Sequence, residues 1–288
     1  MGVKDSFVKG FECANRLWIA VVILWVLQAA VDMSNRIFTS AIAPGQSPSL
    51  SLLLPLIVRA VCFLSVYSTL WLIWYGGLMG TLSQMLRGVE ESAQEFLTTG
   101  LRLFWPMVWL SSLEMGIMLG LFLLLMLAVA GLALLAKLGP AMVIVAVLLG
   151  IGIVLTIVLL SMGLAVVFLY APMSLVELQQ GVMAAMRDAF LFVRRRLGGT
   201  LGIVGLMFVL GAAAMIVCMI LAAFSTGLHL GMKPETLQQN PMPLWLTLLA
   251  NAVSSYGYVF FVAVLYAYYS GNRESGEPEG PTNGNTPL

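Results

Sequence analysis

Long apolar runs dominate this chain, and they exceed what the core of a soluble protein holds. The segment Leu201–Phe224 contains no charged residue, and about 20 apolar residues in a helix cross the ~30 Å hydrocarbon layer of a bilayer. The 288 residues are 60% hydrophobic and 9% charged, whereas an ordinary soluble domain is about 25% charged. We therefore expect an all-α, polytopic integral membrane protein.

Six runs of this kind predict six transmembrane helices. They extend over Leu17–Val31, Leu52–Leu78, Phe104–Ala136, Ala141–Tyr170, Thr200–Phe224 and Leu244–Tyr269. A polar connection, Asp32–Ser51, follows the first span, and another that contains His229 follows the fifth. Near the end of the sixth span stand Tyr266, Tyr268 and Tyr269, a residue type that favours the water interface. We expect a single membrane domain over residues 1–271 and a disordered tail over 272–288.

Three further segments predict amphipathic helices on the cytoplasmic surface, because their apolar residues recur at helical spacing between charged ones. They are Val3–Ala14, just ahead of Arg16, then Thr81–Leu103 and Leu175–Arg196. An arginine stands at the entry to the following span in each case, at positions 16, 102 and 196. These separations of 86 and 94 residues favour a threefold repeat of amphipathic helix, span, span, with units of about 1–80, 81–173 and 174–271. The alternative is that any six-span protein with basic cytoplasmic loops has this pattern.

The distribution of basic residues predicts the orientation. Ten Lys and Arg fall on one side of the six spans and three on the other, and cytoplasmic loops carry the excess in membrane proteins. The larger group is Lys4, Lys9, Arg16, Arg87, Arg102, Arg187, Arg194, Arg195, Arg196 and Arg273; the smaller is Arg36, Lys137 and Lys233. We expect a multi-pass protein of the cell membrane with both termini in the cytoplasm.

One stretch resembles a known family. The motifs run in the order Ala171-Pro172, Glu177, Gly181, Ala185, the phenylalanine-rich 189–192, Val193-Arg194-Arg195-Arg196 and Thr200-Leu201-Gly202. This order resembles the membrane domain of glycerophosphoryl diester phosphodiesterases and related six-helix bacterial and archaeal membrane proteins of unknown function. In that family an Ala-Pro ends one span, and an arginine-rich amphipathic segment precedes the next. The resemblance implies a membrane architecture without hydrolase activity, because the family's enzymes use paired histidines in a soluble barrel and this chain has one histidine.

Five polar residues are candidates for an ion pair or a pathway inside the membrane, where an ionisable side chain costs at least about 2.5 kcal/mol near the centre. They are Arg59, Glu114, Asp32, Gln28 and Asn251. Arg59 and Glu114 fall at matching depth in the second and third spans, so we predict an ion pair between them, with Asp32 as the alternative partner of Arg59. Such a pair either fixes the order of the helices or forms part of a gate.

The sequence offers no set of residues for catalysis. Cys13, Cys62 and Cys218 lack CxxC spacing, and His229 has no ligand set around it, so we expect neither an enzyme nor a metal or cofactor site. The net charge of +1 argues against nucleic acid as a partner.

Two functions remain open. The first is a scaffold whose cytoplasmic face binds membrane lipids or a protein partner, and its candidate surface is Arg187, Arg194, Arg195 and Arg196. The alternative is a transporter or channel for a small or lipidic solute, with Arg59, Glu114, Gln28 and Asn251 along its path. Gly116 and Gly120 form a GxxxG step, which favours close packing within the bundle or a homo-oligomer.

Overall fold

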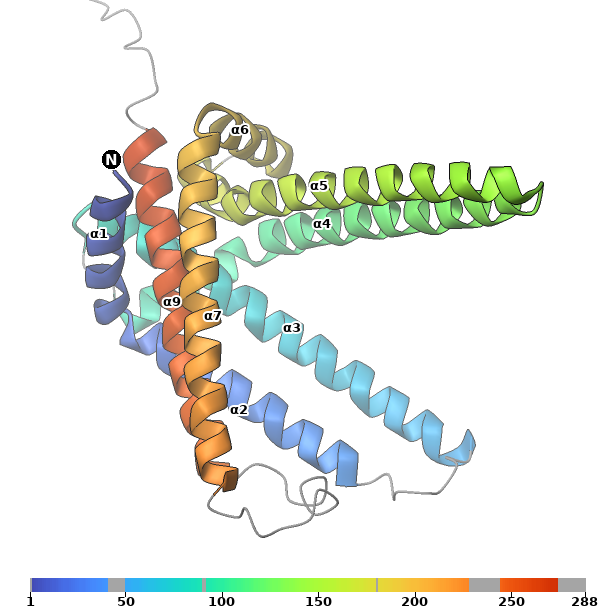
Figure 1. The fold of residues 1–288 in the computed structure, drawn as a ribbon. Coiled ribbons are helices and arrows are strands. Elements are labelled where there is room, and N and C mark those ends of the chain that lie inside the picture. The colour runs from blue at the N-terminus through green and yellow to red at the C-terminus, as the bar shows by residue number, and fades with distance from the viewer. Residues whose placement is uncertain (1, 41–49, 90–91, 180, 228–243, 274–288) are drawn as a thin grey trace, which may run out of the picture. The chain divides into compact units, whose positions relative to one another are not determined.

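The protein is all-helical in the part that its computed structural model describes, which is residues 2–40, 50–89, 92–179, 181–227 and 244–273. These residues form eight helices (Figure 1). The helices are α1 (Val3–Arg16), α2 (Trp18–Ser40), α3 (Leu50–Leu86), α4 (Ala93–Ala136), α5 (Pro140–Leu178), α6 (Val182–Arg195), α7 (Leu197–Gly227) and α9 (Leu244–Arg273).

Five helices are long and apolar enough to cross a membrane. The qualifying segments are Trp18–Arg36 in α2, Ile57–Leu86 in α3, all of α4, all of α5, and Thr247–Arg273 in α9. Among the described residues, a sixth is reached only if α6 and the first part of α7 count as one span. The expectation of an all-α protein with several apolar helices is therefore confirmed, and the sixth span stays a prediction.

The chain divides into two compact units. Unit 1 comprises Met1–Leu101 and Leu197–Leu288, and unit 2 comprises Arg102–Arg196. Unit 1 thus contains α1, α2, α3, α7, α9 and the beginning of α4, and unit 2 contains the rest of α4 with α5 and α6.

Helix α9 is the centre of unit 1. It contacts α1, α2, α3 and α7, and every residue from Val262 to Tyr269 is buried. Glycines allow two of these contacts. A Cβ atom on Gly10 of α1 would lie 2.5–2.8 Å from atoms of Val264, and one on Gly199 of α7 would collide with the Tyr268 hydroxyl. Small residues let helix backbones approach closely, as in membrane bundles.

Burial of α9 corrects the expectation for its tyrosines. Tyr266 and Tyr269 are fully buried and Tyr268 is 3% exposed. Their rings therefore pack inside the protein and do not face a water interface. Glycines of α1 and α7 let those helices pack against this end of α9, and this packing buries the tyrosines. The residue spacing within α9 carries no information about these neighbours.

The expected continuous helix over Thr81–Leu103 is wrong. Helix α3 ends at Leu86 and α4 begins at Ala93. Gly88 adopts a φ of +79°, and the Val89 N–H donates to the Gln84 carbonyl at 3.0 Å, a closure typical of a helix C-terminus. A capping box then starts α4, since Ser92 N donates to Glu95 Oε2 at 2.7 Å and Glu95 N donates to Ser92 Oγ at 3.3 Å.

The middle amphipathic segment is thus divided between two helices. Its first residues extend α3, and its last residues are the start of α4, whose 44 residues extend about 66 Å at 1.5 Å per residue. Close contacts hold the two helices together here: a Cβ on Gly77 would lie 2.8 Å from the Phe96 carbonyl oxygen, and one on Gly100 would collide with the Ile73 carbonyl oxygen.

Two other expected boundaries move. Asp32–Ser40, expected in a connection, belongs to α2, where Asp32 and Arg36 bond to residues of α9. Pro172, expected to end a span, lies inside α5, which continues to Leu178. Gln179 then ends α5 in a left-handed conformation with φ 49°, so the third amphipathic segment contributes its start to α5 and the remainder to α6.

Unit 2 is built on a long apolar hairpin. Helices α4 and α5 lie side by side (Figure 1) and are joined by a turn in which Gly139 has a φ of +149°. Between residues 111 and 166 the one buried side chain is Ala146. At the other end of α5 the ring of Tyr170 packs on Phe192 of α6 at a centroid distance of 5.1 Å.

Candidate functional site

Polar side chains of α2 and α9 face each other in three hydrogen-bonded pairs. The Ser255 hydroxyl donates to Gln28 Oε1 at 3.0 Å, Asn251 Nδ2 donates to Asp32 Oδ2 at 2.7 Å, and Arg36 Nη2 donates to Thr247 Oγ1 at 2.9 Å. We call these six residues the α2–α9 seam.

Helix geometry explains why these residues meet. Residues four apart lie on one face of a helix, and the seam residues stand at positions 28, 32 and 36 of α2 and at 247, 251 and 255 of α9. The pairs ascend along α2 and descend along α9, so the two helices run antiparallel. Trp25 adds a further link, because its Nε1 donates to the Leu248 carbonyl at 2.8 Å.

The seam contains one carboxylate and one guanidinium. Asp32 precedes Arg36 by one helical turn, the order that is more favourable for opposite charges on a helix. Both side chains are half-buried, and each also bonds to a neutral group on α9. An unsatisfied polar group in hydrocarbon costs several kcal/mol. Interhelical hydrogen bonds therefore stabilise the association of α2 with α9 in a membrane.

The structure brings together three of the five predicted intramembrane residues, namely Gln28, Asp32 and Asn251. Arg59 is exposed on α3 and makes no hydrogen bond or ion pair with another described residue. Glu114 is half-buried on α4 and belongs to unit 2, whereas Arg59 belongs to unit 1. The predicted ion pair between these two residues stays a prediction.

Sequence reasoning missed Arg36, Thr247 and Ser255. The predicted boundaries place Arg36 in a connecting segment, and Thr247 and Ser255 are not among the predicted site residues. A polar residue at every fourth position of two apolar helices was the signal that could have found them.

An aromatic cluster stands beside the seam within unit 1. Trp71 and Trp74 of α3 pack on Tyr258 of α9 at centroid distances of 5.6 and 5.8 Å. Trp74 is 2% exposed, and its Nε1 donates to the Ala20 carbonyl of α2 at 2.9 Å. This cluster fixes α3 against the same two helices that form the seam.

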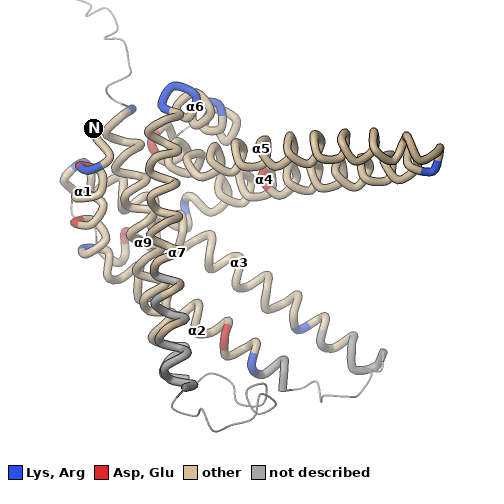
Figure 2. Tube along the Cα trace, viewed as in Figure 1, with Lys and Arg blue, Asp and Glu red and all other residues tan. Residues whose placement is uncertain are grey.

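The predicted basic surface lies on α6 and at its C-terminal cap, Arg196. Arg187, Arg194, Arg195 and Arg196 are exposed, whereas Ala185, Ala189, Phe192 and Val193 are buried. Figure 2 shows basic residues gathered on α6, while the α4–α5 hairpin carries few charges along its length. Ser174 Oγ of α5 donates to Asp188 Oδ2 of α6 at 2.8 Å, and this bond fixes which face of α6 remains open.

The predicted glycine step stands on an open helix face. Gly116 and Gly120 of α4 are exposed, and a Cβ added to either would meet nothing within 4 Å among the described residues. The step therefore makes no close helix contact within the described chain, and a homo-oligomer through it stays a prediction.

The described residues hold no group of three His, Cys, Asp or Glu that could bind a metal ion. Cys13 is buried in α1, and burial raises the pKa of its thiol, with the Arg16 guanidinium acting in the opposite direction. His229 and the side chain of Cys218 lie outside the described part of the chain.

Comparison with known proteins assigns this chain to no group. No family model matches it, and neither a curated protein nor a solved structure matches it.

Proposed function

We propose that this protein is a non-enzymatic scaffold of the cell membrane whose cytoplasmic face binds anionic lipids or a protein partner. The observation that carries the proposal is the separation of the two faces of α6. One face is apolar and buried, and the other exposes Arg187, Arg194, Arg195 and Arg196. A basic residue near an anionic membrane surface contributes about 1 kcal/mol, so four of them supply about 4 kcal/mol if they act independently.

The proposal includes six spans, both termini in the cytoplasm and a repeated building block. Helices α1 and α6 support the repeat, since each has 14 residues and each is separated by a single residue, Leu17 or Arg196, from a long apolar helix. In the middle copy the corresponding residues, 93–102, are continuous with the span in α4. Pro106 stands there inside the helix, where it leaves the carbonyl of Arg102 without its usual N–H partner.

Orientation is tested by cysteine labelling in intact cells. In a background with Cys13, Cys62 and Cys218 replaced by alanine, we expect Arg195→Cys and Glu95→Cys to react with an impermeant maleimide only after the cells are opened. Lys137→Cys, in the α4–α5 turn, should react from outside. Reaction of Arg195→Cys in intact cells would contradict the proposed orientation.

Lipid binding is tested by the lipid that the purified full chain retains from nanodiscs of mixed phosphatidylcholine and phosphatidylglycerol. We expect enrichment of phosphatidylglycerol around the wild-type protein and a clear reduction of it in the variant Arg187→Gln/Arg194→Gln/Arg195→Gln/Arg196→Gln. The control is Lys137→Gln, which removes an exposed charge on the opposite side of the proposed topology. Equal enrichment in all three proteins would show that α6 does not bind the lipid. A protein partner would then be the remaining candidate for this surface.

A second candidate, transport of a small or lipidic solute, rests on the α2–α9 seam. Asp32 lies within the spanning segment of α2 and Arg36 at its end, and a charge inside a span often marks a pathway. Against transport, each seam residue already has a protein partner. Conductance or solute uptake by proteoliposomes that Asp32→Asn abolishes would favour transport over the scaffold.

A further inference from the structure

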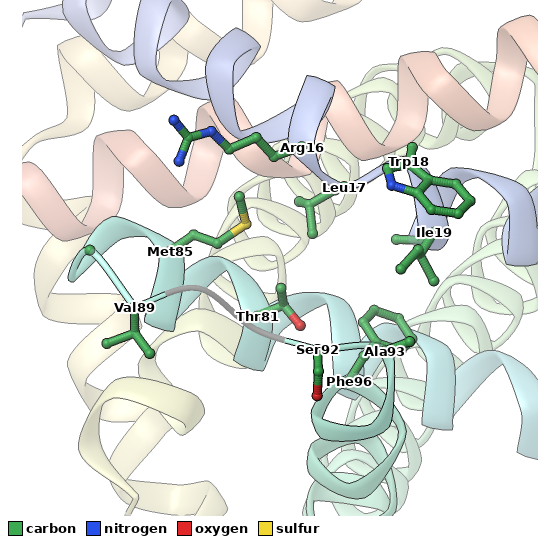
Figure 3. A pocket seen from close by; sticks show the side chains of 12 residues that line it. Arg16, Leu17, Trp18, Ile19, Thr81, Met85, Val89, Ser92, Ala93 and Phe96 are labelled. Carbon is green, nitrogen blue, oxygen red and sulfur yellow. The ribbon is translucent and has the colours of Figure 1, made fainter.

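A cavity lies at the junction of α1 and α2, where these helices meet the end of α3 and the start of α4 within unit 1 (Figure 3). Its volume is about 510 Å³, within the ~300–1,000 Å³ range of small-ligand sites. Its walls come from Arg16, Leu17, Trp18, Ile19, Ala20, Thr81, Met85, Gly88, Val89, Ser92, Ala93 and Phe96.

Among the lining residues, Thr81 is unusual because its hydroxyl is buried without a described hydrogen-bond partner. Its side chain is 6% exposed, and its hydroxyl has no hydrogen-bond partner among the described residues. Buried polar groups in folded proteins are nearly always bonded, and leaving one unsatisfied costs about 1–3 kcal/mol. Figure 3 shows the hydroxyl on the side of Ser92 and Phe96, within the ring of lining residues. The group is therefore placed to bond to something that enters the cavity.

The remaining polar groups favour an anion. Arg16 is exposed at the rim and makes no hydrogen bond or ion pair with another described residue. On α4, Glu95 is already bonded to Ser92. Glu90 and Glu91, which stand between Val89 and Ser92 in the sequence, lie outside the described residues.

The apolar walls identify the rest of the ligand. Leu17 and Phe96 are buried, and Trp18 is 63% exposed at the rim, where an indole is suited to the membrane interface. Figure 3 shows Arg16 and Trp18 extending in opposite directions from the α1–α2 junction. A ligand that meets a guanidinium, a buried hydroxyl and an apolar wall together is an anionic amphiphile.

We propose that this cavity binds the phosphate and glycerol region of an anionic phospholipid, with the guanidinium of Arg16 on the phosphate and the hydroxyl of Thr81 on a ligand oxygen. Arg pairs with phosphate through parallel N–H bonds. The site deepens the proposed lipid-binding function, on which it rests. Its residues all belong to unit 1, whereas the arginines of α6 belong to unit 2.

The test is native mass spectrometry of the full chain in detergent, titrated with phosphatidylglycerol, with phosphatidylcholine and with inorganic phosphate. We expect one tightly held phosphatidylglycerol that phosphatidylcholine does not replace and that millimolar phosphate does not displace. Arg16→Gln should weaken its binding about tenfold or more, since it removes charge-assisted hydrogen bonds. Thr81→Val should weaken it several-fold while leaving the melting temperature unchanged or higher.

Ala93→Trp supplies a variant that fills the cavity without touching either polar group, and it should abolish the tight site. The α6 variant with four glutamines should still hold the one tight phosphatidylglycerol. Failure of lipid binding at α6 and failure of lipid binding at this cavity can therefore be told apart. Displacement by inorganic phosphate would assign the cavity to soluble phosphorylated compounds and overturn the lipid proposal. Full retention of the site in Ala93→Trp, or in both Arg16→Gln and Thr81→Val, would also overturn it.

Discussion

The helix pair α2–α9 and the helix pair α4–α5 are both apolar, yet they are held together in different ways. The pair in unit 1 is joined by three side-chain hydrogen bonds on successive helical turns. Of one apolar 18-residue stretch in each helix, 17% is buried in α2 and 33% in α9. In unit 2 the corresponding stretches of α4 and α5 are 0% and 6% buried, and the two helices meet through apolar side chains.

The difference follows from the solvent. In lipid, an apolar side chain gains little by leaving the surrounding hydrocarbon, so helix association depends on close packing and on hydrogen bonds. Unit 1 uses both, through its glycines and the α2–α9 seam. The α4–α5 hairpin leaves nearly its whole surface for lipid, for other parts of the chain or for another copy.

The largest expected effect distinguishes glycines in the two regions. Gly10→Ala should lower the free energy of unfolding by about 2 kcal/mol, because the new methyl group meets the backbone of Val264 in a packed contact. The matched control is Gly120→Ala on α4, where nothing lies within 4 Å among the described residues. There the same change should be neutral or stabilising by up to about 1 kcal/mol.

Thermal unfolding in detergent measures both variants. A Gly10→Ala protein that is as stable as the Gly120→Ala protein would mean that α1 does not pack on α9 as described.

The next effect concerns the seam. Asp32→Ala should destabilise the protein by about 1 kcal/mol, since the amide of Asn251 loses its acceptor, and interhelical hydrogen bonds in membranes contribute about 0.6–1.7 kcal/mol. A double-mutant cycle with Asn251→Ala should give a coupling energy in the same range. Ser65→Ala is the control, because that hydroxyl bonds only to the Val61 carbonyl of its own helix among the described residues. A coupling energy of zero would contradict the pairing of α2 with α9.

The smallest effect is the pH dependence of Cys13. Because burial raises its pKa, the native thiol keeps its proton at a pH where the unfolded thiol ionises. The unfolded state therefore binds fewer protons above about pH 8.5, and stability should fall as the pH rises past that value. Cys13→Ala should reduce this fall. Reaction of native Cys13 with a disulfide reagent should also be at least about tenfold slower than that of Glu12→Cys in a Cys13→Ala background.

Much of the fold was predictable because it depends on local pattern. The existence and order of α1 and of the apolar helices followed from the spacing and length of apolar residues, whereas α2, α3, α4 and α5 each extend eight or more residues beyond the expected spans at one end. Local signals also marked the break between α3 and α4, namely Gly88 after α3 and the capping pair Ser92 and Glu95 before α4. The apolar periodicity across Thr81–Leu103 nevertheless predicted one continuous helix. The end of α2 was predicted too early for another reason. Asp32 and Arg36 are charged, so the sequence alone suggests a solvent-exposed connection, and only their partners on α9 explain why the helix continues.

The sequence by itself determined that this chain is helical, that most of its helices suit a membrane, and that its charges gather outside the apolar runs. Only the tertiary structure decided that Gln28, Asp32 and Arg36 form one seam and that Arg16 and Thr81 share a cavity. The reason is physical: helical spacing fixes which residues share a face, but it carries no information about which face of a helix more than 200 residues away will satisfy them.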